Sequence, residues 1–388
     1  MECIMTQKSE KSSRESKTFP KLIIASTEEC ADLLYAGGFD APDEFLYYET
    51  DTEKCIVVSP LEFARAAAEA KPGVKVIDRT RFVNREKPAE SIVVNLSRSL
   101  GIDSWFVPSR FPLGEAEKLR AAGIQLTCSP DGSFFPERQI KSRTELKAIR
   151  QSQNATEEIM RELRQILIDS KINSLGFLEY HGKVLTSEFL RLELESNFKR
   201  SGYTANRTII AHGPQCAEPH NIGTGPIRAD ETIVADIFPR SDLTGYWGDM
   251  TRTFVKGKAP RLIKNASKAV LKASEAAKKM LKAGVTGAEA HKTAADILTH
   301  AGFPSGCGRD GKPCGFFHGL GHGVGLEIHE NPRLSPLNPN PLQAGNVVSV
   351  EPGLYYSEWG GIRLEDLVVI SSKGCICLNT MEMELEIP

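Results

Sequence analysis

The stretch at residues 315–332, GFFHGLGHGVGLEIHENP, holds three histidines within twelve residues, and glycines surround them. Because glycine lacks a Cβ, we expect the backbone here to approach a bound centre closely. The stretch is not a dinucleotide-binding loop, since a G-x-G-x-x-G pattern that begins at Gly319 meets Val324 at its sixth position. It is not a zinc-protease helix either. His329 has no second histidine four residues later, and a helix does not tolerate this density of glycine.

Four acidic side chains stand in short apolar segments that we expect to be strands. They are Asp236 in VADIF, Asp249 in WGDMTRTF, Glu351 in SVEPGLYY and Glu365 in GGIRLEDLVV. The first two lie thirteen residues apart and the last two fourteen, so a hairpin can bring each pair together. An acid in an apolar strand is costly unless it is paired with a cation or bound to a metal.

Two explanations fit these buried acids. Several carboxylates with one imidazole suit Mn²⁺, Co²⁺ or Zn²⁺, and they carry enough charge to neutralise two such ions. The alternative is pairing with Arg252 and Arg363, but that alternative leaves the histidine cluster unexplained.

The chain around these motifs shows one helix and strand pattern twice. Amphipathic helices at 144–170 and 185–202 precede apolar strands at 208–211, 232–238 and 252–256. The second block has helices at 260–284 and 288–303, followed by strands at 346–352, 362–370 and 375–379. We therefore expect one α+β domain, over residues 144–388, that consists of two similar halves.

The N-terminal part has a different rhythm. Residues 19–136 alternate short β-rich and helical runs, among them KLIIAS, ADLLYAG, EFLYYE, KCIVVS, EFARAAAEA, VKVID and SIVVNL. This βαβα pattern predicts a smaller α/β domain over a parallel or mixed sheet. We interpret residues 1–18 as a disordered polar tail and residues 137–143 as the linker between the domains.

Composition excludes several classes of protein. The 388 residues are 40% hydrophobic and 25% charged, with a net charge of −2, which argues against a general nucleic-acid or polybasic membrane binder. No apolar run is long enough to span a bilayer, and the tail lacks a secretory signal, so we expect a cytoplasmic protein. Nine scattered cysteines without a C-x-x-C pair argue against a disulfide framework, although Cys307 and Cys314 are near enough in sequence to pair.

Together these residues resemble the pita-bread metallopeptidases, which include aminopeptidase P, prolidase and methionine aminopeptidase. Matched residue by residue, the resemblance implies a dinuclear centre, with Mn²⁺ as the first expectation. Asp236 would serve one metal and His322 with Glu351 the other, while Asp249 and Glu365 would bridge the two. The N-terminal domain resembles the creatinase-type domain of the proline-specific branch.

The resemblance also implies a mechanism, in which a metal-bridging hydroxide attacks the Xaa-Pro bond. Glu351 would carry the proton, and His329 and His318 would flank the substrate. His220, in AEPHNIG, would lie near the leaving group. The remaining two assignments, which orient the bridging carboxylates, are Arg363 and Tyr355.

The resemblance leaves several alternatives. The first reading is an Xaa-Pro aminopeptidase that acts on peptides with proline at the second position, and the second is an Xaa-Pro dipeptidase. A methionine aminopeptidase, a creatinase and a non-catalytic peptide-binding relative fit the motifs less well. By the same resemblance we expect a homodimer. Two departures are the acid spacing of thirteen, where the family usually has eleven, and a Gly-rich insertion at 306–314 that we expect at the rim of the pocket.

Overall fold

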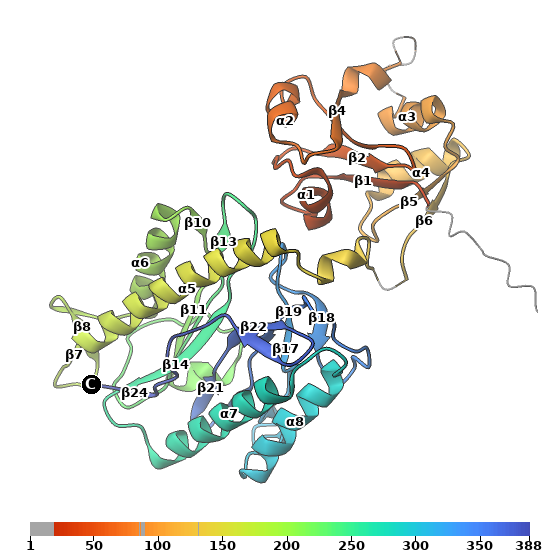
Figure 1. Cartoon of the computed structure of the whole chain (residues 1–388). Coiled ribbons are helices and arrows are strands. Elements are labelled where there is room, and N and C mark those ends of the chain that lie inside the picture. Colours follow the sequence, from red (N-terminus) through yellow and green to blue (C-terminus); the bar gives the residue numbers. More distant parts are fainter. Residues whose placement is uncertain (1–18, 85, 87–89, 131) are drawn as a thin grey trace, which may run out of the picture. The chain divides into compact units, whose positions relative to one another are not determined.

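The computed structural model describes residues 19–84, 86, 90–130 and 132–388. The prediction for the tail at residues 1–18 lies outside this described part. The chain divides into two compact units between Pro136 and Glu137 (Figure 1).

The N-terminal unit contains a six-stranded mixed sheet in the order β4-β3-β2-β1-β5-β6. Its strands are β1 (Lys21–Ala25), β2 (Phe45–Glu49), β3 (Lys54–Val58), β4 (Val74–Asp78), β5 (Ser104–Phe106) and β6 (Gln125–Thr127). Its helices are α1 (Ala31–Gly37), α2 (Phe63–Glu69), α3 (Ile92–Leu100) and α4 (Leu113–Ala121). The apolar run SIVVNL begins α3. The Ser91 side chain accepts a hydrogen bond from the Val93 amide there, which starts a helix despite the β-branched residues.

Four long helices organise the C-terminal unit. They are α5 (Arg143–Asp169), α6 (Ser187–Arg200), α7 (Arg261–Met280) and α8 (Gly287–His300). Capping boxes begin two of them, Ser142 with Glu145 at α5 and Thr286 with Glu289 at α8. Among the described residues, no helix combines the length and apolar composition that crossing a bilayer requires.

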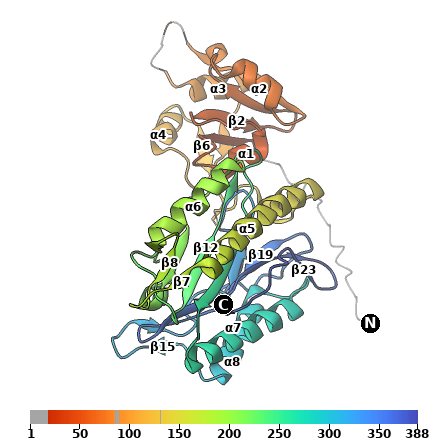
Figure 2. The ribbon, with the colours of Figure 1, turned by 90° about the vertical axis from the view of Figure 1, so that its left-hand side faces the viewer.

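Two larger sheets lie between the helix pair α5 and α6 and the helix pair α7 and α8 (Figures 1 and 2). The first has the order β11-β12-β14-β24 and the second β18-β17-β19-β22-β23. The strands of the first are β11 (Ile209–His212), β12 (Ile233–Ile237), β14 (Met250–Lys256) and β24 (Glu386–Ile387). Those of the second are β17 (Gly321–Gly323), β18 (Glu330–Leu334), β19 (Val347–Val350), β22 (Asp366–Ile370) and β23 (Cys375–Cys377).

Short strands complete the unit. They are β7 (Lys171–Ile172), β8 (Leu178–Tyr180), β9 (Lys183–Val184), β10 (Tyr203–Thr204), β13 (Arg240–Ser241), β15 (Gly306–Cys307), β16 (Pro313–Cys314), β20 (Gly353–Tyr356) and β21 (Gly360–Arg363). The insertion at 306–314 is thus the β15–β16 hairpin. Its register pairs Cys307 with Pro313 and Cys314 with Gly306, so the two thiols point to opposite faces, and both are free.

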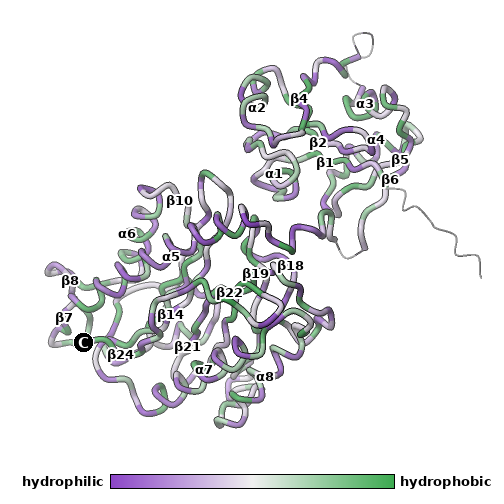
Figure 3. Tube along the Cα trace, viewed as in Figure 1, coloured by the Kyte–Doolittle hydropathy of each residue, from purple (hydrophilic) through white to green (hydrophobic). Residues whose placement is uncertain are grey.

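Each half of the C-terminal unit has its own hydrophobic core. Side chains of α5 and α6 pack with β12 and β14 around residues such as Leu163 and Phe254. Side chains of α7 and α8 pack with β19, β21 and β22 around residues such as Val270 and Val348. Figure 3 shows strands β19 and β22 as largely hydrophobic, whereas the helices mix polar and hydrophobic residues. This agrees with the amphipathic pattern of the two sequence blocks.

The two sheets meet where the acidic residues lie. Strands β12 and β14 are antiparallel, with Asp236 opposite Thr251. Strands β19 and β22 are antiparallel, with Val350 opposite Asp366, so Glu351 and Glu365 lie directly beyond that last pair. The Glu365 amide donates to the Thr251 carbonyl at 3.0 Å, which joins the halves. Both carboxylate pairs are therefore held at one junction.

Candidate metal centre

The structure brings the five predicted ligands together. Atoms of Asp249, His322 and Glu365 that suit a metal lie within 4.8 Å of one another, and all three residues are buried. The His322 Nε2 atom is 3.2 Å from Glu351 Oε1 and 3.6 Å from Asp249 Oδ2. Asp236 lies near enough for its charge to raise the pKa of both Asp249 and Glu365.

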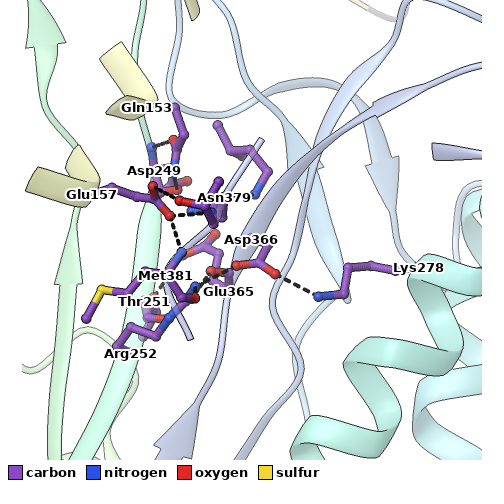
Figure 4. Close-up of polar contacts among 12 residues, drawn as sticks. Gln153, Glu157, Asp249, Thr251, Arg252, Lys278, Glu365, Asp366, Asn379 and Met381 are labelled. Carbon is purple, nitrogen blue, oxygen red and sulfur yellow. Dashed lines mark hydrogen bonds and ion pairs between the residues drawn. The ribbon is translucent and has the colours of Figure 1, made fainter. Parts of the chain in front are cut away.

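An ion pair with arginine neutralises one of these acidic side chains, Asp236. Arg363 Nη2 lies 2.7 Å from Asp236 Oδ2, as the pairing alternative predicts. Arg252 instead pairs with Asp366 at 2.8 Å, and it also donates to the Glu365 carbonyl oxygen at 2.6 Å (Figure 4). The carboxylates of the cluster thus outnumber the cations that contact them.

The excess negative charge fits divalent cations. Burial raises the pKa of Asp249 well above its ordinary value, and the charges of Glu365 and Asp236 raise it further. Burial likewise raises the pKa of Glu365 and of Asp236. Within the described part of the chain, the buried Asp236 Oδ1 atom has no hydrogen-bond partner. Bound cations would relieve the repulsion and satisfy this atom.

The pKa of Glu351 is lowered, in contrast to those of the neighbouring carboxylates. Burial alone would raise its pKa, but the hydrogen bond and charge of His322, with the charges of His318 and Arg363, lower the pKa to about 2. Ser349 Oγ also donates to Glu351 Oε1 at 3.2 Å. Glu351 is therefore ionised at neutral pH.

Residues that the sequence analysis missed hold the candidate ligands in place. Thr251 Oγ1 donates to Glu365 Oε2 at 2.8 Å and accepts a hydrogen bond from Arg363 Nε at 3.2 Å. The Gln153 amide on α5 pairs with the backbone of Asp249 through two hydrogen bonds of 2.9 Å (Figure 4).

A sequence signal for two of the missed residues exists. Thr251 follows Asp249 by two residues, and Ser349 precedes Glu351 by two. Residues two apart in a strand face the same side, so each polar side chain shares the face of a ligand. Gln153 gives no comparable signal, because it lies on a helix far away in sequence.

The glycines of the histidine stretch serve a purpose other than the predicted one. A Cβ on Gly321 would lie 2.0 Å from the Ser349 carbonyl oxygen, and one on Gly323 would lie 2.5 Å from that of Asn331. A Cβ on Gly325 would lie 2.5 Å from Glu330 Oε1. The prediction that these three glycines admit a bound centre is therefore wrong, because protein atoms fill that space.

Both ring nitrogens of His318 form hydrogen bonds within the protein. Its Nδ1 atom is 2.7 Å from the Gly319 carbonyl oxygen, and its Nε2 atom is 3.0 Å from the Tyr355 hydroxyl. Burial lowers the pKa of His318, and because a carbonyl oxygen can only accept a hydrogen bond, the Nδ1 atom is the donor in the contact with Gly319. Because the Tyr355 oxygen accepts from Arg363 Nη1 at 3.0 Å, its own proton is directed to His318.

His329 and His220 have exposed side chains. The His329 ring centroid lies 4.3 Å from that of His322, and the rings are nearly perpendicular. Burial of part of the ring, with the charges of His322 and Arg333, lowers the pKa of His329 to about 4. The charge of His220 contributes to the lowered pKa of both His318 and His329, which places it near them.

A carboxylate-rich centre with one imidazole, at the junction of two similar α+β halves, defines a metal-dependent hydrolase with the pita-bread architecture. The family model described as metallopeptidase family M24 matches residues 147–372, and the chain belongs to this family. An Xaa-Pro dipeptidase of Pyrococcus horikoshii is 31% identical over 288 residues, which cover 74% of this chain and 75% of that protein.

Solved structures agree with this assignment. The X-Pro aminopeptidase of Thermotoga maritima matches with a TM-score of 0.78 at 24% identity, over 95% of this chain and 97% of that one. The prolidase of P. horikoshii matches with a TM-score of 0.77 at 26% identity, over 95% of both chains. The predicted α+β pita-bread fold and the predicted family are thus confirmed.

Proposed function

We propose that this protein is a metal-dependent exopeptidase that hydrolyses the Xaa-Pro bond at the N-terminus of peptides, with residues 144–388 as the catalytic domain. The observation that carries the proposal is the cluster of four carboxylates and His322 with one arginine partner. Relatives named Xaa-Pro dipeptidase, prolidase and X-Pro aminopeptidase support the proline-specific reading. We also propose a homodimer, by resemblance to the same branch, and a cytoplasmic location, from the composition.

The residues fit two divalent ions, with Mn²⁺ as the first choice and Co²⁺ or Zn²⁺ as alternatives. Asp236 would hold one ion, and His322 with Glu351 the other, while Asp249 and Glu365 would be shared between them. When bound, two such ions lower the pKa of a water molecule and polarise the scissile carbonyl. The mutual repulsion of the buried carboxylates supports this assignment.

The side chains of the site carry out proton transfer, stabilisation of the oxyanion and positioning. Glu351 takes the proton of the attacking water and passes it to the proline nitrogen as the C–N bond breaks. The exposed ring of His329 donates to the carbonyl oxygen as negative charge develops there. Arg363 and Tyr355 orient Asp236 and His318, and we keep His318 as the second histidine that flanks the substrate.

His220 is assigned to the leaving side of the substrate. Arg363 Nη1 donates to the Pro219 carbonyl oxygen at 3.3 Å, which fixes the segment that carries His220. The bond before proline is a tertiary amide without an N–H. A site that binds the carbonyl oxygen and the leaving nitrogen does not need an N–H hydrogen bond from the substrate.

One observation favours the dipeptidase alternative. A dipeptidase requires a group that binds the free carboxylate of proline, and arginine suits this task. Arg333 lies near enough to His329 for its charge to lower the pKa of that histidine, and its side chain is exposed. Arg333 is therefore our candidate for binding that carboxylate.

The test uses protein loaded with Mn²⁺ and an equimolar mixture of Ala-Pro and Ala-Pro-Ala-Ala, followed by mass spectrometry. Loss of alanine from the tetrapeptide supports the aminopeptidase, and loss from the dipeptide alone supports the dipeptidase. An Arg333→Met variant that loses only dipeptide turnover identifies the carboxylate reader. If the loaded protein cleaves neither peptide, the proline assignment fails, and methionyl peptides are tested next.

A further inference from the structure

We propose that Arg138 and Lys141, in the segment predicted as a linker, are positioning residues for the loop that carries His329. They act through Glu330, which directly follows His329. The inference rests on the proposed role of His329, and it adds a part of the chain that the ligand set and the mechanism do not include.

The contacts form a compact ion cluster. Arg138 Nη2 lies 2.8 Å from Glu330 Oε2 and 3.0 Å from Glu327 Oε2. Lys141 Nζ contacts Glu330 Oε1. The side chains of Lys141 and Glu330 are 2% and 7% exposed, and that of Arg138 is 11% exposed. Among the described residues, Arg138 and Lys141 thus both contact the carboxylate of Glu330, one at each oxygen.

The loop closes around the Glu330 carboxylate. The Glu327 amide donates to Glu330 Oε2 at 3.4 Å, and the Gly325 amide donates to the Glu327 carbonyl oxygen at 3.1 Å. Glycine at 325 leaves room for this carboxylate, because a Cβ there would lie 2.5 Å from Glu330 Oε1. Trp247 holds the other side of the loop, with its amide 3.0 Å from the Gly325 oxygen and its indole nitrogen 3.1 Å from the Leu326 oxygen.

The segment that supplies the cations is itself fixed to the catalytic unit. The Lys141 amide donates to the Gly345 carbonyl oxygen at 2.9 Å. Asn346 Nδ2 donates to the Gln139 carbonyl oxygen at 2.8 Å. Asn346 directly precedes β19, the strand that leads to Glu351. The same short segment therefore connects the start of that strand with the loop that carries His329.

Stability alone is a weak reason for this cluster. The desolvation of a buried ion pair offsets much of its Coulomb attraction, and apolar replacements often cost little stability. The two cations instead fix the orientation of the Glu330 side chain. They fix the Glu330 side chain at two oxygens, and thereby fix the backbone of its neighbour His329. A displacement of about 1 Å in a catalytic group costs up to about 100-fold in rate.

The experiment compares Lys141→Met, Glu330→Gln and the control Arg161→Met in the full-length, Mn²⁺-loaded protein. Arg161 pairs with another buried glutamate, Glu157, at 3.0 Å on α5, away from the loop. We expect kcat to fall about 10- to 100-fold in the first two variants, with KM within about threefold and metal content unchanged. Hydrogen exchange at residues 325–330 should become faster in these variants only. Lys141→Arg, which keeps the charge, should restore most of kcat.

The outcomes are distinguishable. Unchanged kcat in Lys141→Met, or equal losses in Arg161→Met, would overturn the proposal. If Glu330→Gln fails to fold, Lys141→Met decides, because it leaves the Arg138–Glu330 pair intact. If the wild type cleaves no peptide, the proposed function fails, whereas unchanged hydrogen exchange at 325–330 contradicts the positioning role separately.

Discussion

Replacing Thr251 by valine tests whether the support of Glu365 sets metal affinity. Valine keeps the shape of threonine but removes the hydroxyl, which donates to Glu365 Oε2 and accepts from Arg363 Nε. The hydrogen bond from Thr251 lowers the pKa of Glu365 against the effect of burial. Without it, the ionised carboxylate that a metal requires becomes harder to form.

The size of the effect follows from this bond. A hydrogen bond to a charged group contributes about 1.5–3 kcal/mol. Since about 1.4 kcal/mol corresponds to a factor of ten, metal affinity should fall about 10- to 100-fold. The same range is typical of residues that support metal ligands from outside the coordination sphere.

Thr253→Val is a matched control. Thr253 lies on the same face of β14 and is also buried, but among the described residues its hydroxyl bonds the backbone of Arg363, at 2.8 and 3.1 Å, and no carboxylate. We expect this variant to lose about 1–3 kcal/mol of stability and to keep its metal affinity. Titration of Mn²⁺ by calorimetry measures the affinity, and Tm in excess chelator measures the stability. Equal affinities in the Thr251 and Thr253 variants would refute the reasoning.

Three further predictions concern the centre itself. Asp249→Asn, which keeps the side-chain volume, should release metal and abolish turnover, as shown by elemental analysis and peptide cleavage; full activity with bound metal would contradict a shared ligand. His329→Ala should keep its metal and lower kcat about 100- to 1000-fold, the usual cost of removing one donor to a developing oxyanion, and a variant that loses metal instead would argue for a ligand role. The third concerns pH. Because the pKa values of Asp249 and Glu365 are raised in the folded metal-free protein, their contribution to its stability falls as pH rises above the ordinary carboxyl range. Metal binding requires the ionised forms, so the rise in Tm on adding Mn²⁺ should increase with pH; a constant rise between about pH 5 and pH 7.5 would contradict the raised pKa values.

Strand periodicity and chemistry explain how much of the centre the sequence predicts. Asp236 and Glu365 stand out because a charge in an apolar strand needs a partner. The repeated order of helices and strands predicts the two halves of the C-terminal unit. Both inferences use local patterns, which a single sequence displays directly.

Contacts between segments that are distant in sequence are harder to predict from the sequence. Gln153 and Asp249 are far apart in sequence, and nothing local marks the glutamine as a partner of that backbone. Residues 137–143 appear as a polar connection, yet Lys141 is buried against Glu330. The glycines around His322 suggest space for a bound centre, whereas neighbouring chain segments fill that space. In each case the partner is defined by tertiary packing.

The division of the five proposed ligands between two halves has a consequence for biosynthesis. A nascent chain that ends at Lys256, the last residue of β14, contains Asp236 and Asp249 but none of the other three ligands. The ribosome completes the ligand set only when it adds Glu365. A partly made protein therefore lacks the set that hydrolysis needs, and a peptidase built in this way stays inactive toward peptides around the ribosome until both halves have been translated.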